Sequence, residues 1–464
     1  MVLGNLVQQG QGLSNYATVS KEWQAHIERE NFSQIKLTAP CLDMFAQIVI
    51  RQRQYVKSIW LNIELPRYTC VSCRRRESIS NMRINNAVVG RAVSKLFAIL
   101  GSWPPAQDAL TWELSVQSPS DKEHFGRGIH FGTEQWHPSQ ISAPRMDMVA
   151  RHNHNLTRYG WNFGIFGLSR MFGLIDLAPL RLQRLPEVHA IPRWVIGRQC
   201  RRYFMPQTLI LIDHKLPRME ALVHESWQIS RRLANDQRYD WDTDSATTTI
   251  YIPSSSRLRR MCLFEDFDDN YLTMMTHVPP LVTNLAHAEA LARRSLPLRI
   301  FSCSFVIDAQ HFFLSLEPDW SWPNLESLAL TSRVLVPTAD QEEVVELLVR
   351  AAQAALRMPN LQTMTLWNGR RSMACAFTYS KTNDENHCPS IAWRGTWDLE
   401  FPPHLIQAWE EVVSTFTLVK MRTAKEFLDP GTIRSHGDAV EHLQLVNAAL
   451  DQASVQQIQR EANR

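Results

Sequence analysis

Two cysteines three residues apart, Cys70 and Cys73, are the residues with the most evident chemistry in the chain. Thiolates at this spacing can bind one tetrahedral zinc ion, but a structural zinc site needs four ligands. The chain has no second Cys-x-x-Cys and no His-x-x-x-His at a suitable spacing. We therefore predict two ordinary thiols and no metal site, and we interpret residues 74–76, three consecutive arginines, as a solvated turn.

Two acidic runs are candidates for cation binding. Asp240, Asp242 and Asp244 imitate the first half of a calcium-binding loop. Ser245 stands where that loop needs glycine, and Tyr251 stands where it needs a bidentate glutamate, so the pattern does not predict a calcium site. The second run, residues 265–269, follows a predicted strand, and we interpret it as a solvated loop.

The remaining catalytic and phosphate-binding patterns fail on spacing. Ser169 lacks the second glycine of a nucleophile elbow. Gly126, Gly128 and Gly132 lack the dinucleotide-binding spacing, and residues 152–154, which contain two histidines, are interpreted as a polar loop. We therefore expect no catalytic residues, no cofactor and no metal, and we predict that the protein is not an enzyme.

The composition is that of an ordinary globular protein. The 464 residues allow about three domains of roughly 150 residues or one large repeat array. A net charge of +3, from 49 basic and 46 acidic residues, does not indicate nucleic-acid binding. Arg170 and Asp176 interrupt the most apolar stretch, and the first residues lack the features of a secretory signal. We expect a cytoplasmic or nuclear protein without a membrane partner.

The N-terminal forty residues carry apolar residues at helical spacing. Val2, Leu3, Leu6 and Val7 predict a short amphipathic piece. A second stripe follows steps of three and four residues, which places its members on one helix face: Leu13, Tyr16, Val19, Trp23 and Ile27. Asn31 is a predicted stop for this helix. So few residues cannot bury an independent core, so we predict an interaction element or an ordinary cap on a larger domain.

The rest of the chain repeats a Leu-x-x-Leu-x-Leu spacing with substitutions. The units start at residues 56, 109, 219, 258, 298, 325 and 361. The last positions of each unit alternate as a short strand requires, and stacked units would share one core. The spacing between units is irregular, so both a degenerate repeat array and a generic α/β sheet remain open.

Helical segments are predicted between the strands. Residues 338–341 have the spacing of a capping box, and an apolar stripe follows until Pro359. Residues 281–293 give a similar helical pattern. Long insertions near 65–108 and 118–218 are predicted to form loops or extra helices. The polar residues 431–464 predict a helical tail that is either docked or frayed.

The first of these segments resembles a known family. Val19-Ser20-Lys21-Glu22-Trp23, then Ile27 and Phe32 before Ile35-Lys36-Leu37, resembles the second half of an F-box. The Leu-Pro-x-Glu that usually opens an F-box is absent, since the chain starts at Met1-Val2-Leu3, already inside the first helix. The wider pattern resembles a group of fungal F-box-like proteins at residues 185–188, 264–267, 329–332, 366–369 and 393–399.

The resemblance implies an α/β protein with three parts. Residues 1–39 would be a short helical F-box-like element, incomplete at its start. Residues 40–430 would be an irregular leucine-rich-repeat-like solenoid of strands and helices, and residues 431–464 the helical tail.

The implied function is substrate recognition in a cullin–RING ubiquitin ligase of the SCF type. A Skp-type adaptor would bind the N-terminal helices, and an unidentified protein target would bind the repeat domain. The expected adaptor-binding residues are Leu3, Leu6, Val7, Leu13, Tyr16, Val19 and Trp23. The alternative is a protein-interaction scaffold with a vestigial F-box and no role in a ligase.

Overall fold

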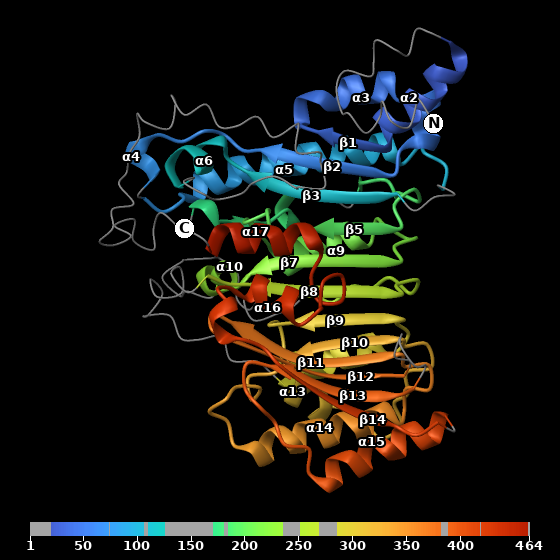
Figure 1. Cartoon of the computed structure of the whole chain (residues 1–464). Coiled ribbons are helices and arrows are strands. Elements are labelled where there is room, and N and C mark those ends of the chain that lie inside the picture. Colours follow the sequence, from blue (N-terminus) through green and yellow to red (C-terminus); the bar gives the residue numbers. More distant parts are fainter. Residues whose placement is uncertain are drawn as a thin grey trace. The chain divides into compact units, whose positions relative to one another are not determined.

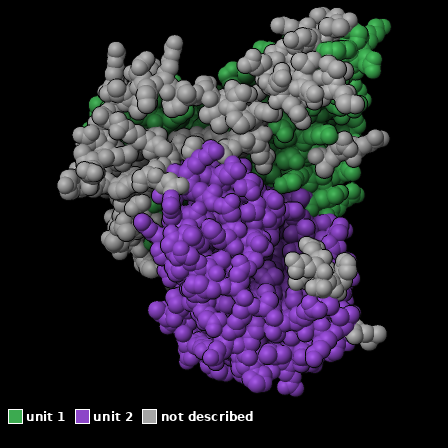
Figure 2. Space-filling model, viewed as in Figure 1, with its two compact units in different colours: residues 1–220, 226–257, 267–278 green, residues 221–225, 258–266, 279–464 purple. Residues whose placement is uncertain are grey.

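The computed structural model describes residues 20–73, 75–105, 110–125, 170–180, 184–234, 251–268, 285–381, 388–417 and 419–462. Strands and helices alternate along these residues, so the protein is mixed α/β with a mostly parallel arrangement of strands. The chain divides into two compact units, which Figure 2 colours separately. The first holds residues 1–220, 226–257 and 267–278, and the second holds residues 221–225, 258–266 and 279–464.

The first unit is built on four parallel strands in the order β1-β2-β3-β5. Figure 1 traces its elements. They are α2 (Lys21–Ser33), β1 (Gln34–Leu37), η2 (Ala39–Cys41), α3 (Leu42–Ile48), η3 (Arg51–Tyr55), β2 (Ser58–Glu64), α4 (Cys70–Cys73), α5 (Ile79–Leu100), β3 (Thr111–Gln117), α6 (Pro119–Phe125), β4 (Leu174–Ile175), η6 (Ala178–Leu180), β5 (Arg193–Ile196), β6 (Tyr203–Phe204), α9 (Pro206–Asp213) and α10 (Gln228–Ala234).

The two faces of this first sheet differ in chemistry. Trp112 of β3 stacks on Trp194 of β5 at a centroid distance of 5.6 Å, and Phe97 of α5 meets the edge of Trp112, so α5 covers an apolar face. On the other face the Trp60 indole donates to Ser115 Oγ at 2.8 Å, and Ser115 Oγ donates to Asn62 Oδ1 at 3.0 Å. In β2 and β3 the inner residues of both faces are buried.

Helix α2 begins later than the sequence pattern predicts. Ser20 has extended backbone angles and caps the helix, since its hydroxyl accepts a hydrogen bond from Trp23 N at 3.2 Å. A single helical stripe from Leu13 to Ile27 is therefore wrong, because it is broken at Ser20. Asn31 does not stop the helix, which ends at Ser33 and leads directly into β1.

The second unit contains the longer run of strands. Its elements are β7 (Ala221–Trp227, of which residues 221–225 belong here), β8 (Arg260–Asp266), α12 (Leu285–Ser295), β9 (Ile300–Ser304), α13 (Ala309–Leu314), β10 (Ser327–Thr331), α14 (Gln341–Ala355), β11 (Thr363–Arg370), β12 (Met373–Ser380), β13 (Ser390–Gly395), α15 (Pro403–Phe416), β14 (Arg422–Phe427), η9 (Pro430–Thr432), α16 (His436–His442) and α17 (Gln452–Ala462). Strands β8 to β11 are parallel neighbours, whereas β12 is antiparallel to both β11 and β13.

The repeated apolar spacing corresponds to these parallel strands. Equivalent positions of the units starting at 258, 298, 325 and 361 stand side by side in the sheet, because the register pairs Met261 with Phe301, Phe301 with Leu328, and Leu328 with Met364. The first residue of each of these units is also buried. The side chains at these positions therefore form one continuous apolar face.

The helices of the second unit cover that apolar face. The ring centroids of Phe312 in α13 and Phe301 in β9 are 5.9 Å apart. Those of Trp409 in α15 and Phe377 in β12 are 5.3 Å apart. The predicted stripe on α14 is buried as expected, but its cap is Asp340, whose carboxylate accepts from Glu342 N, and not Thr338. Of the helix predicted at 281–293, residues 285–295 are described and form α12.

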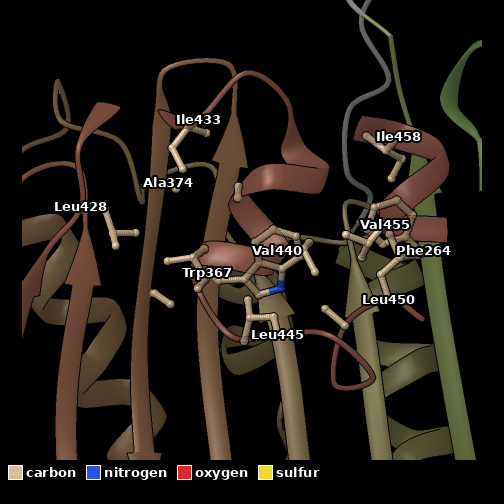
Figure 3. Close-up of a cluster of buried hydrophobic side chains, with 14 residues drawn as sticks. Phe264, Trp367, Ala374, Leu428, Ile433, Val440, Leu445, Leu450, Val455 and Ile458 are labelled. Atoms are coloured by element: carbon tan, nitrogen blue, oxygen red, sulfur yellow. The ribbon is translucent and has the colours of Figure 1, made fainter. Parts of the chain in front are cut away.

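The C-terminal residues are docked on the opposite face of the second sheet. Helix α16 contacts β11 and β12. Val440 of this helix and Leu445, which follows it, pack around the Trp367 indole (Figure 3). Leu450 and Val455 belong to the same buried cluster and lie around Phe264 of β8 (Figure 3). The tail is thus part of the core of this unit rather than a frayed end. Among the described helices, none combines the length and apolarity needed to cross a membrane.

Candidate protein-binding groove

An apolar groove lies beside the edge of the first sheet. It has a volume of about 330 Å³ and is bordered by the end of α2, the whole of β1 and one side of α3. Its apolar lining includes Phe32, Ile35, Met44 and Ile48, and Lys36 is the one charged residue among the described residues that line it. A groove of this composition suits apolar side chains rather than a charged ligand.

Helix α3 owes its exposed apolar side to its sequence. Leu42 and Phe45 point inward and are buried, and Phe45 lies 5.8 Å from Trp103. Met44 and Ile48, one helical turn apart, are 59% and 51% exposed. A helix that packs one apolar side on its own core and offers a second apolar side to solvent is typical of a binding surface.

Strand β1 is an end strand of the sheet. It pairs in parallel with β2, and Lys57 N donates to Ser33 O at 2.8 Å at the start of that pairing. Because backbone groups alternate in direction along a strand, those of Gln34 and Lys36 face away from β2, toward the groove. No other strand of the described residues pairs with β1 on that side. Backbone donors and acceptors and an apolar wall therefore lie next to each other.

The charge of Lys36 does not protect the edge of β1 against pairing with another strand. Lys36 Nζ lies 4.3 Å from the centroid of the Trp60 ring, over the polar face of the sheet. Burial lowers the pKa of Lys36, while Glu64 opposes that effect. The ammonium group of Lys36 therefore lies over the Trp60 ring and not at the unpaired edge of β1, where lysines often prevent strand pairing.

Of the predicted adaptor-binding residues, the structure describes one. Trp23 is on α2 and is partly exposed, one turn before the buried Ile27. The other six, Leu3, Leu6, Val7, Leu13, Tyr16 and Val19, lie outside the described residues. The sequence analysis did not identify Met44 and Ile48 as candidate binding residues. These two residues are four positions apart, a spacing that could have indicated a second apolar side of α3 beside the buried Leu42 and Phe45.

The chemical motifs have different outcomes. The calcium-like residues 240–245, the histidines at 152 and 154, Ser169 and the glycines at 126, 128 and 132 lie outside the described residues. Cys70 and Cys73 form the short helix α4, where Cys70 Sγ lies 3.8 Å from His124 Nδ1. Within the described residues, no three side chains of His, Cys, Asp or Glu come together as a metal-binding group.

The prediction of a solvated loop at 265–269 is wrong at its start. Glu265 and Asp266 belong to β8 and are 2% and 0% exposed. Asp266 Oδ1 lies 2.8 Å from Nε2 of His436, which is also buried, and this pair joins β8 to α16. These acids are therefore structural parts of the second unit and not surface charges.

Comparison with known proteins gives one match. Residues 251–451 match a protein family described as a family of unknown function, DUF6546. No curated protein matches the chain, and no solved structure matches it. The matched residues include β8 to β14 and α16, so the family similarity covers strands and docked helices of the second unit and not the groove.

Proposed function

We propose that this protein is the substrate-recognition subunit of a cullin–RING ubiquitin ligase. In this proposal the N-terminal element, residues 1–39, binds a Skp-type adaptor. The strand-and-helix body is an irregular leucine-rich-repeat-like solenoid that binds a protein target. The observation that carries the proposal is the apolar groove, because α2, which belongs to the F-box-like segment, ends at a surface with exposed Met44 and Ile48.

The solenoid part of the proposal is supported by register. Units of Leu-x-x-Leu-x-Leu spacing contribute one parallel strand each, and equivalent apolar positions stand side by side in β8 to β11. Helices α12, α13 and α14 return between these strands. A strand and a returning helix that repeat in this way stack because neither can bury its apolar side alone.

The proposed mechanism is positioning. The protein would hold a target near the catalytic subunits of the ligase and raise its effective concentration there. Bond formation between ubiquitin and the target would occur on those other subunits. The contribution of this chain would therefore be measured as binding, and its loss as slower target modification.

Binding of the full chain to a purified Skp-type adaptor, measured by biolayer interferometry, tests the proposal. We expect Leu3→Asp and Met44→Asp each to weaken binding at least tenfold, about 1.4 kcal/mol. Leu314→Asp is the matched control, since Leu314 is 54% exposed in the second unit and should leave binding unchanged. Failure of the unaltered chain to bind the adaptor, or an equal loss in the control, would overturn the proposal.

A second candidate is a protein-interaction scaffold without a ligase role. It is favoured by the position of the family match, which begins at residue 251 and leaves out the F-box-like segment. This scaffold would bind protein partners through the same body. Adaptor binding separates the two candidates, because the scaffold predicts none for any variant.

A further inference from the structure

Cys70 and Cys73 sit one helical turn apart in α4, which follows β2. Cys70 is partly exposed and Cys73 is fully buried. In a helix, residues three apart have Cα atoms about 5 Å apart, which lies within the range that a disulfide spans. The pair thus combines an accessible thiol with a second thiol within reach.

A histidine is held against the accessible thiol. His124 Nδ1 lies 3.8 Å from Cys70 Sγ, and His124 Nε2 lies 3.4 Å from the carbonyl oxygen of Tyr68. A carbonyl can only accept, so this contact favours the tautomer with a proton on Nε2, which leaves the Nδ1 lone pair facing the thiol. Nδ1 is therefore placed to take the proton of Cys70.

The imidazole is fixed in this position. The Tyr68 ring stacks on His124 at a centroid distance of 5.2 Å. The Tyr68 hydroxyl donates to Asp121 Oδ1 at 2.7 Å, and Asp121 is buried at the start of α6, where its Oδ2 accepts from Ser118 N at 2.8 Å. A base that is oriented by a third group is the arrangement that activates nucleophiles in proteins.

We propose that Cys70 and Cys73 are a redox-active dithiol that reacts with small disulfides such as oxidised glutathione. His124 takes the proton of Cys70, and the thiolate attacks one sulfur of the external disulfide. That S–S bond breaks, one glutathione leaves as a thiolate and is protonated, and a mixed disulfide remains on Cys70. The thiol of Cys73 then loses its proton and attacks Cys70 Sγ, which releases the second glutathione. Two electrons pass from the two protein thiols to the external disulfide.

Three other thiols of the chain, those of Cys41, Cys200 and Cys375, lack this combination. Burial raises the pKa of Cys200 to about 11 and that of Cys375 to about 12, so both remain thiols at neutral pH. Cys41 is exposed but contacts the hydroxyl of Thr38 at 3.1 Å rather than a base. Exposure alone therefore does not distinguish Cys70, whereas exposure together with His124 and a neighbouring thiol does.

The test treats the full chain with excess oxidised glutathione, quenches it by alkylation and maps it by mass spectrometry. We expect the unaltered chain to lose two hydrogens and to link Cys70 to Cys73. Cys73→Ser should instead trap glutathione on Cys70, and Cys70→Ser should give neither product. Cys41→Ser is the control and should behave like the unaltered chain. Circular dichroism shows whether each variant is folded.

A second readout tests the histidine. Alkylation of Cys70 at pH 7 should be about tenfold slower in His124→Gln, while alkylation of Cys41 should not change. The proposal is overturned if Cys70 and Cys73 remain reduced in excess oxidised glutathione, or if Cys70 in the unaltered chain reacts no faster than Cys41. Protection of both thiols by zinc alone would overturn it in favour of metal binding.

Discussion

His436 Nε2 lies 2.8 Å from Asp266 Oδ1, and both residues are buried. The pair connects β8 to α16, 170 positions later in the chain. A second polar contact, from Ser454 Oγ to Glu225 Oε2 at 2.7 Å, connects α17 to β7. The same C-terminal residues contribute to the buried apolar cluster around Trp367 and Phe264. The last thirty or so residues therefore cover the face of the second sheet that its other helices leave uncovered.

The first prediction concerns this pair. His436→Ala should destabilise the second unit by about 3 kcal/mol, because a buried carboxylate loses a polar partner and gains no solvent. Because the chain has two units, unfolding need not be two-state. We would therefore measure hydrogen exchange of residues 431–462, which should become much faster.

His442→Ala is the matched control, since His442 is exposed at the end of the same helix. It should leave exchange in residues 431–462 unchanged. In the double variant Asp266→Asn with His436→Ala, the cost should be smaller than the sum of the two single costs. Additive costs would show that the two side chains do not interact.

The second prediction concerns the contact between α16 and α17. A Cβ added at Gly437 would stand 2.9 Å from Ile458 Cγ2 and 3.1 Å from the Val455 carbonyl oxygen. Glycine to alanine normally favours a helix, by about 1 kcal/mol. Gly437→Ala should instead destabilise the second unit by about 1–3 kcal/mol, because the two helices are forced apart.

Ile458→Ala tests whether removing the crowded side chain relieves the cost of Gly437→Ala. It removes Cγ2, one of the closest atoms, and opens a cavity that alone should cost about 2 kcal/mol or more. If the clash is real, adding Gly437→Ala to this background should cost less than in the unaltered chain. Thermal melts of the four proteins of this cycle provide the measurement. A Gly437→Ala protein with a higher melting temperature would contradict the structure.

The sequence predicted several of the strands, though not their direction, because their apolar spacing is local. The units starting at 56, 219, 258, 298, 325 and 361 coincide with β2, β7, β8, β9, β10 and β11. Strands β12 and β13 were not predicted. Neither strand contains a leucine, so the Leu-x-x-Leu-x-Leu spacing that marks the other strands is absent from them. Strand β12 also follows β11 through a tight turn, with Ser372 at a φ of 60°, and not through a returning helix.

The candidate sites depended on contacts that local patterns do not encode. An acidic run such as Glu265-Asp266 is usually solvated, and His436, a buried partner of Asp266, lies 170 positions along the chain. In the same way, Cys70 and Cys73 were visible as a motif, but His124 is 54 positions away from Cys70. The pattern of residue types was enough to identify the two thiols. The histidine that faces Cys70 could be identified only from the folded structure.

The third prediction is a pH dependence caused by His224 in β7. Burial lowers its pKa from 6.5 to about 4. Between these values the unfolded chain binds a proton that the folded chain does not, so stability falls as pH falls from about 6.5 to 4. His224 keeps part of its surface exposed, so we expect a loss of about 1–2 kcal/mol, less than the full pKa difference would give.

Urea unfolding at pH 7.5 and at pH 5 measures this effect. His224→Gln should lose less stability between the two pH values than the unaltered chain does. His404→Gln is the control, because His404 is exposed in α15 and its replacement should leave the pH dependence as it is. The same pH dependence in all three proteins would show that His224 is protonated equally in both states.

The fourth prediction compares two aspartates that cap helices of the same unit. Asp308 is buried and accepts three hydrogen bonds, from Gln310 N at 2.9 Å, Ser332 Oγ at 2.7 Å and Arg333 N at 2.9 Å. It thus ties α13 to the residues that follow β10. Asp340, which caps α14, is exposed, and its cap is the bond from Glu342 N.

Asp308→Ala should therefore cost about 3 kcal/mol and Asp340→Ala about 1 kcal/mol. The reason for the difference is that the groups facing Asp308 are shielded from water, whereas water can replace the carboxylate of Asp340. Ser332→Ala should fall between them, because it removes one of the three bonds and leaves the cap of α13 intact. Urea unfolding followed by tryptophan fluorescence orders the three variants, and equal costs for the two aspartates would mean that Asp308 acts as a cap alone and does not join α13 to β10.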